Sequence, residues 1–176
     1  MSDRALELKH QGNRALVRRD YEGSAKAFRE LIQLSPDSPD GYIGLAKVLE
    51  RTHEHQAIVD LLEPASRKVQ RAGVLKSLGN AYRVLARRGQ AGVVDRGIEV
   101  YEAYLAQRED PVILFYLAGL YRLKKEYGEA LSRLRRSWAL DPGSESVYAA
   151  ALECARRVGH DESLKEIESW SSAVRR

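Results

Sequence analysis

Residues 114–142 read LFYLAGLYRLKKEYGEALSRLRRSWALDP, and the opening part of this stretch recurs along the chain. The related fragments are QGNRA at 11–15, LAKVL at 45–49, LGNAY at 78–82 and LAGLY at 117–121. They begin at residues 11, 45, 78 and 117, so the spacings are 34, 33 and 39 residues. Self-similarity at such a period predicts a stacked array of helix pairs, because a single helical hairpin cannot bury its apolar face without neighbours.

Apolar residues with helical spacing divide each repeat into two helices. In the first repeat, Ser24, Phe28 and Leu31 lie at i, i+4 and i+7, and the helix is expected to end at Ser35, because a following proline disfavours helix. The same pattern predicts five helix pairs in one domain over residues 1–176. The predicted repeats are 5–38, 39–71, 72–110, 111–144 and 145–176.

These repeats resemble the tetratricopeptide repeat family, whose pattern is a large residue, Leu-Gly, Tyr, Ala, an aromatic residue and Pro at fixed offsets. Repeats 5–38 and 111–144 fit that pattern without gaps. The resemblance implies an all-α fold, a right-handed α-solenoid of about five helix-turn-helix repeats. Small residues are expected where the two helices of a hairpin press together. They are Gly12, Ala46, Gly79, Ala118, Ser24, Ala57, Gly97 and Ala130.

Three segments depart from the regular pattern. Residues 85–97, LARRGQAGVVDRG, lengthen the third repeat, and we interpret them as a longer helix end plus a loop. The alternative is a basic finger that contacts a partner through Arg87 and Arg88. The second helix of repeat two is predicted to bury Ala57, Leu61 and Pro64, and Pro64 is predicted to bend or break it near Glu63. The last predicted helix, 162–174, has a single apolar stripe, as expected for a polar capping helix.

Composition excludes some classes of protein. The chain has 176 residues, 44% of them hydrophobic and 31% charged, and it contains no apolar run of the ~18 residues that a membrane span needs. The start, MSDRALELKH, lacks the apolar stretch of a signal peptide, so we expect a cytoplasmic location. Use of 21 arginines against eight lysines suggests a bacterial source.

The resemblance also implies where a partner binds, since the first helices of tetratricopeptide repeats line a concave groove. Basic residues assigned to this groove number eight and acidic residues three, which gives a net charge of +5 against +4 for the whole chain. The basic ones are Lys9, Lys47, Arg51, Lys76, Arg83, Arg122, Arg156 and Arg157, and the acidic ones Asp40, Glu50 and Glu153. Also assigned to it are Asn13, Gly44, Asn80, Val112, Phe115, Tyr116, Gly119, Leu123 and Ala150.

A basic groove with aromatic residues predicts an adaptor or chaperone-like scaffold that binds a short acidic peptide or helix with an apolar anchor. Two alternatives stay open. Lys9 and Asn13 resemble half of the carboxylate clamp of heat-shock co-chaperones, but the other clamp positions hold Gly44, Gly73 and Ser77. A sequence pI of about 9.2 also suits RNA, which we rank below a protein partner. Self-association through the fifth repeat is a third partner class.

The sequence offers no catalytic, cofactor or metal motif. His53 and His55 are two residues apart, a spacing that does not place both on one helix face, and we interpret them as part of a surface turn. Cys154 lies among small residues and is predicted to be buried. Trp138 and Trp170 are predicted to pack between adjacent hairpins. We therefore expect a protein that is not an enzyme.

Overall fold

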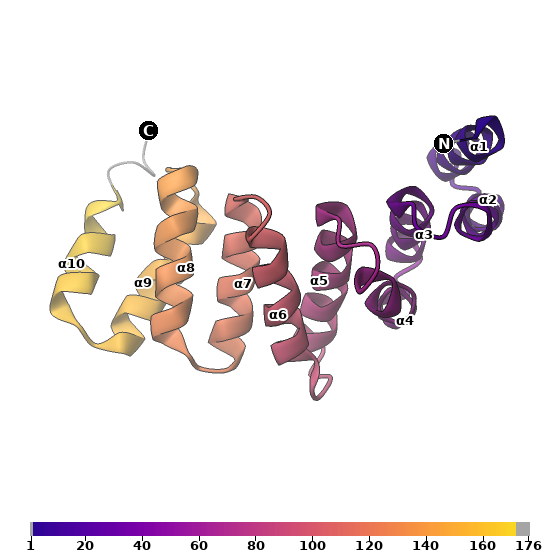
Figure 1. Ribbon diagram of the computed structural model, residues 1–176. Helices are drawn as coiled ribbons and strands as arrows, with labels where there is room; N and C mark the ends of the chain where they lie inside the picture. Colours follow the sequence, from indigo (N-terminus) through magenta and orange to yellow (C-terminus); the bar gives the residue numbers. More distant parts are fainter. Residues whose placement is uncertain (1, 172–176) are drawn as a thin grey trace. The chain divides into compact units, whose positions relative to one another are not determined.

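The computed structural model describes residues 2–171, and in that range it contains ten helices and no strand (Figure 1). Each predicted repeat contains two of these helices. They are α1 (Asp3–Val17), α2 (Tyr21–Leu34), α3 (Pro39–Arg51), α4 (His55–Ser66), α5 (Ala72–Arg87), α6 (Val93–Leu105), α7 (Pro111–Leu123), α8 (Tyr127–Leu140), α9 (Glu145–Val158) and α10 (Asp161–Ser169). The predicted all-α class is confirmed.

The chain divides into two compact units, Met1–Gln90 and Ala91–Arg176. We call them unit 1, which holds α1 to α5, and unit 2, which holds α6 to α10. The division lies within the 85–97 insertion, where α5 continues to Arg87 and a loop follows. Both Arg87 and Arg88 are exposed.

Polar residues and prolines start the helices where the sequence indicates. The Ser2 hydroxyl accepts a hydrogen bond from the Ala5 amide, and Asp110 accepts from the amides of Val112 and Ile113. Pro39 and Pro111 occupy first helical positions, where no amide donor is needed. These first helices therefore begin at defined residues.

The turns inside the hairpins share one backbone motif. The amides of Asp20, Glu54, Gln90 and Glu126 each donate to the carbonyl five residues earlier, at 2.8–3.1 Å. This is the Schellman closure, which needs a left-handed residue just after the helix. Gly89 fills that position with φ of 80°, but Arg19, His53 and Lys125 do so with φ of 61–63°. Three of these turns therefore present a basic or histidine side chain at a fixed position.

Phe28 is the centre of the core of unit 1. Its ring is buried and lies against two glycines, because a Cβ atom at Gly12 would be only 2.8 Å from the ring and one at Gly44 would be closer still. The Ser24 hydroxyl donates to the Gly12 carbonyl at 2.8 Å, which joins α1 to α2. The predicted close approach at Gly12 and Ser24 is confirmed, although the neighbour of Gly12 is the Phe28 ring.

Helix α4 differs from the prediction in two respects. Its buried stripe is Ile58, Leu62 and Ala65, one residue later than predicted, and Pro64 is exposed. The predicted break at Glu63 is wrong, because α4 continues to Ser66. Pro64 lies in the last turn of the helix and on its exposed side, where a missing amide donor disturbs little of the remaining helix.

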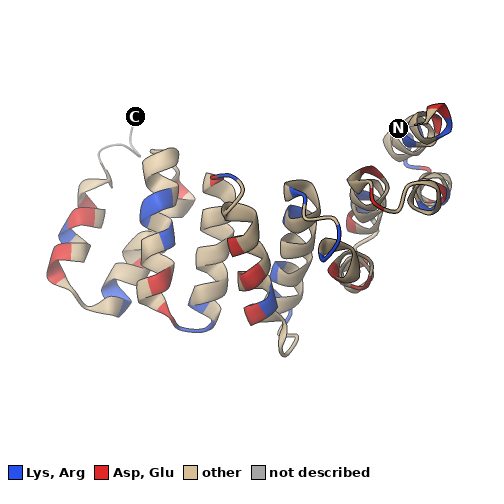
Figure 2. Cartoon of the chain, in the orientation of Figure 1, with Lys and Arg blue, Asp and Glu red and all other residues tan. Residues whose placement is uncertain are grey.

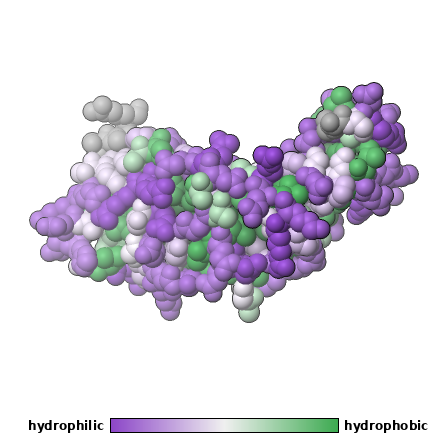
Figure 3. Space-filling model, viewed as in Figure 1, coloured by the Kyte–Doolittle hydropathy of each residue, from purple (hydrophilic) through white to green (hydrophobic). Residues whose placement is uncertain are grey.

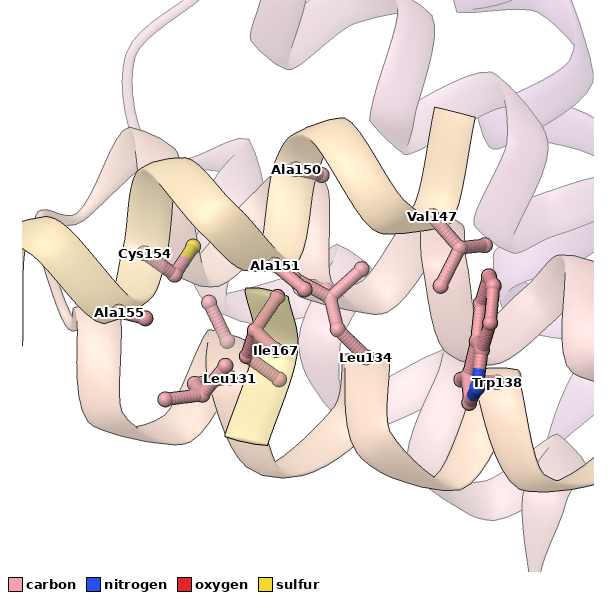
Figure 4. Packing of buried hydrophobic residues seen from close by; sticks show 11 residues of the cluster. Leu131, Leu134, Trp138, Val147, Ala150, Ala151, Cys154, Ala155 and Ile167 are labelled. Carbon is pink, nitrogen blue, oxygen red and sulfur yellow. The ribbon is translucent and has the colours of Figure 1, made fainter. Parts of the chain in front are cut away.

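The core of unit 2 joins α7, α8, α9 and α10 (Figure 4). Ile167 of α10 is fully buried among Leu131, Ala151 and Cys154, so the last described helix covers the array with one apolar stripe. The rings of Trp138 and Trp170 stack 4.6 Å apart, as expected for packing between neighbouring hairpins. Val174, the end of the predicted stripe, lies outside the described residues.

Ion pairs tie equivalent helices of neighbouring repeats together. Four pairs join residues 31 positions apart, which is about one helical turn less than the 34-residue repeat. They are Lys9–Asp40 between α1 and α3, Glu102–Arg133 between α6 and α8, Arg122–Glu153 between α7 and α9, and Arg135–Glu166 between α8 and α10. The three pairs in unit 2 share one spacing, so its repeats stack in one register.

No described helix combines the length and the apolar composition that crossing a membrane requires.

Candidate functional site

The residues assigned to the groove lie on first helices in both units. Within unit 1 these helices are neighbours, since α1 contacts α3 and α3 contacts α5. Asn13, Lys47 and Arg51 are exposed there, and Lys76, Asn80 and Arg83 are half-buried. Gly44, which the repeat phase also assigned to the groove, is instead buried beneath Phe28. Unit 1 thus presents basic side chains on three adjacent helices.

Lys9 is held within this surface. Its ammonium group donates to the Asp40 carboxylate at 3.0 Å, which joins α1 to α3. A ligand carboxylate at Lys9 therefore competes with a carboxylate already in place. This contact weighs against the carboxylate clamp, in which the lysine must receive the ligand.

His55 is buried, so its predicted place in a surface turn is wrong. It is the first residue of α4 and only 9% exposed, and it lines a cavity of about 30 Å³ together with residues of α3 and α5. Glu50, Ser77, Asn80 and Arg83 also line this cavity. Burial lowers the pKa of His55, and the positive charge of Arg88 lowers it further. His53, in the preceding turn, is exposed as predicted.

Helix α7 is apolar on two opposite sides. One side is core, with Ile113, Leu114, Leu117, Ala118 and Leu120 fully buried. The other side carries Val112, Tyr116, Gly119 and Leu123 at i, i+4, i+7 and i+11, a spacing that places them in one stripe. We call this stripe, together with Phe115, the α7 face.

The α7 face is open to solvent. Val112 is 46% exposed and Leu123 48%, and the rings of Phe115 and Tyr116 are half-buried with centroids 6.1 Å apart. A Cβ atom built at Gly119 meets nothing within 4 Å. Figure 3 shows that most of the surface in view is hydrophilic, with apolar residues in smaller patches. Exposed apolar residues grouped in one stripe mark an interaction surface more often than scattered ones do.

Helices α7 and α9 of unit 2 carry basic residues. Arg122 pairs with Glu153 of α9, and Arg156 is exposed on the last turn of that helix. The guanidinium of Arg157 lies 5.8 Å from the centroid of the Tyr127 ring. Charges elsewhere on the helices are mixed in sign, as Figure 2 shows for α6 and α8. The sequence prediction placed Phe115, Tyr116, Arg122 and Arg156 in one site, and all four lie on α7 and α9 of unit 2.

Cys154 lies within the core of unit 2. Cys154 is fully buried, and burial raises the pKa of its thiol to about 11, so the nucleophilic thiolate is scarce at neutral pH. Within residues 2–171 no three His, Cys, Asp or Glu side chains are grouped so that they could hold a metal ion.

Part of the chain is similar in sequence to a tetratricopeptide repeat-containing protein. No family model matches the chain. The small glutamine-rich tetratricopeptide repeat-containing protein 2 of Mycosarcoma maydis is 30% identical over 115 residues. The match covers 61% of this chain and 33% of that protein, so the chain spans about a third of its relative's length.

Solved structures match nearly the whole chain. A crystal structure of the MamA protein aligns with a TM-score of 0.82 at 14% identity, covering 98% of this chain and 91% of that one. A tetratricopeptide repeat protein from Parabacteroides merdae aligns with a TM-score of 0.76 at 14% identity, covering 99% of this chain and 68% of that one. A thermophilic TPR protein of Thermus thermophilus aligns with a TM-score of 0.62 at 15% identity, covering 97% of this chain and 98% of that one. The chain thus has the tetratricopeptide repeat fold that its sequence repeats indicate.

Proposed function

We propose that the chain is a protein-interaction module that binds an acidic amphipathic helix, with the α7 face as the apolar anchor point. The coarse part of this proposal follows from the fold, since tetratricopeptide repeats are protein–protein interaction scaffolds. The observation that carries the finer part is that α7 exposes a second apolar stripe opposite the one that it buries.

The shape and chemistry of the α7 face favour a helix as ligand. The stripe repeats every three to four residues, and a partner helix presents its own apolar residues at the same spacing. Gly119 leaves room in the middle, so a large apolar side chain of the partner can sit there. Arg156, exposed on α9 of the same unit, favours carboxylates on the polar flanks of that helix, which speed association and select the partner, whereas Arg122 already pairs with Glu153.

The experiment fills the open position on α7. A Gly119→Trp variant is expected to weaken binding at least tenfold without unfolding the chain, because the new side chain enters open space. Gly128→Trp is the matched control, since a Cβ atom at Gly128 on α8 also meets nothing within 4 Å. The probe is the tightest binder selected from a library of acidic amphipathic peptides, with an affinity expected near the micromolar range, about −8 kcal/mol.

Two results overturn the proposal. One is an acidic library that yields no saturable binder while a basic library of the same apolar pattern does. The other is an equal loss of affinity in the Gly119→Trp and Gly128→Trp variants, which places the peptide elsewhere. Circular dichroism of both variants confirms that each remains folded.

The carboxylate-clamp interpretation is less well supported by the contacts. Lys9 already donates to Asp40, and Gly44 is buried. Exchange of Lys9 for alanine is therefore expected to leave binding of the acidic helix unchanged within about twofold, because unit 2 provides the anchor.

A further inference from the structure

Unit 1 gathers arginines at the edge formed by its hairpin turns. Arg18 and Arg19 follow α1, Arg51 ends α3, and Arg87 and Arg88 end α5 and begin the loop after it. Because α1 contacts α3 and α3 contacts α5, these three helix ends are neighbours. We call these five arginines the arginine edge; Arg51 also belongs to the predicted groove.

The arginine edge lacks acidic partners. All five side chains are exposed, and among residues 2–171 none of them forms an ion pair. Elsewhere in unit 1, Lys9 pairs with Asp40 and Arg4 with Glu7. Helix C-termini attract basic residues in general, but that attraction is modest at an exposed site.

Two carboxylates near the arginine edge accept hydrogen bonds from neutral groups. Asp20 accepts a hydrogen bond from the Gly23 amide at 2.9 Å, and Glu54 accepts one from the Thr52 hydroxyl at 2.6 Å. With Glu50 they make three negative charges against five positive ones, a net of +2 before either histidine is counted. His55 at the start of α4 lines one cavity with Arg83 and Val84 of α5, so the start of α4 lies close to the last part of α5.

We propose that the arginine edge binds the phosphate backbone of a single-stranded nucleic acid, at a site separate from the α7 face. Guanidinium groups present paired donors that match phosphate oxygens, and every cation of this edge is an arginine. Among the described residues, Val17 is the one large apolar side chain beside it that is strongly exposed, whereas protein interfaces have an apolar centre depleted of charge. A row of cations without such a centre suits a linear polyanion.

The test measures how binding of a labelled oligouridine of about 15 nucleotides depends on salt. Each phosphate neutralised contributes about −0.7 to the slope of log K against log salt. The double variant Arg87→Gln/Arg88→Gln is expected to lower the magnitude of that slope by about 1.4 and to bind about tenfold more weakly near 0.1 M salt.

The matched control removes the same charge from the opposite end of a hairpin. Arg67 and Lys68, which follow α4, are also exposed and make no ion pair within the described range. The variant Arg67→Gln/Lys68→Gln is expected to keep the wild-type slope within about 0.3. Equal losses in the two variants would show attraction by net charge alone and overturn the proposal.

A competitor decides between nucleic acid and an acidic protein. Polyglutamate of the same length is expected to displace the oligouridine at least tenfold less well than unlabelled oligouridine does. Equal displacement would overturn the phosphate assignment in favour of an acidic protein segment. Gly119→Trp is expected to leave oligouridine binding intact, so this inference and the proposed function can fail independently.

Discussion

Gly44 shows how one residue without a side chain fixes the packing of three helices. The Phe28 ring of α2 lies between Gly12 of α1 and Gly44 of α3. Gly44→Ala is expected to destabilise unit 1 by about 1–3 kcal/mol, because the new methyl group overlaps the ring. Gly119→Ala, in open space, is expected to be neutral or to stabilise α7 by about 0.5–1 kcal/mol. Chemical denaturation of both variants checks this, and equal stabilities would contradict the packing described.

His55 makes the stability of unit 1 depend on pH. Its pKa is lowered in the folded chain, first by burial and then by Arg88, His53 and Arg83, while Glu50 opposes them. The unfolded chain therefore binds a proton more readily, and stability present above about pH 6.5 is lost as the pH falls below that value. Chemical denaturation at about pH 7 and about pH 5 measures this loss as a difference in the free energy of unfolding.

His55→Leu is expected to remove part of this acid sensitivity, because leucine has no proton to gain. The matched control is His10→Leu at an exposed position on α1. An unchanged difference between the two pH values in His55→Leu would show that other groups cause the effect.

Helix α8 joins the second helices of unit 2 through its arginines. Arg133 donates to Glu102 of α6 from two nitrogens, at 3.2 and 2.9 Å, and lies over the Tyr121 ring. Its side chain is 19% exposed, so this pair is better shielded from water than Arg4–Glu7, whose side chains are 55% and 63% exposed. A double-mutant cycle on Arg133 and Glu102 is expected to give a coupling of about 1 kcal/mol.

The same cycle on Arg4 and Glu7 provides the comparison. Because both side chains are exposed, its coupling is expected to be about 0.3 kcal/mol or less. Urea denaturation of the single and double variants measures both values. A larger coupling for the Arg4–Glu7 pair would contradict the role given to α8.

The repeat of about 34 residues predicted two helices for each repeat, and ten helices are observed within residues 2–171. Helix α4 was placed one residue off, because Ala57 and Leu61 offered an apolar stripe as plausible as Ile58 and Leu62. The burial of His55 was missed, since a histidine in a polar run gives no sign that a neighbouring helix will cover it.

At the scale of the whole molecule, the repeat pattern predicted the fold but not the surface contacts. The assignment of first helices to a binding surface came from the repeat phase, and the prediction of its residues remains a prediction. Repeat phase alone could not show that Lys9 pairs with Asp40 or that Gly44 lies under a ring, because both depend on neighbouring repeats. The division into two units within the 85–97 insertion also had no clear signal beyond its extra length.

The central claim is that the α7 face holds the partner helix. Methyl NMR of the chain titrated with the selected acidic peptide tests it directly. The account predicts saturable shifts at Val112 and Leu123, with none at Leu140, which is 44% exposed on α8. Shifts at Leu140 with unchanged Val112 and Leu123 signals would contradict it.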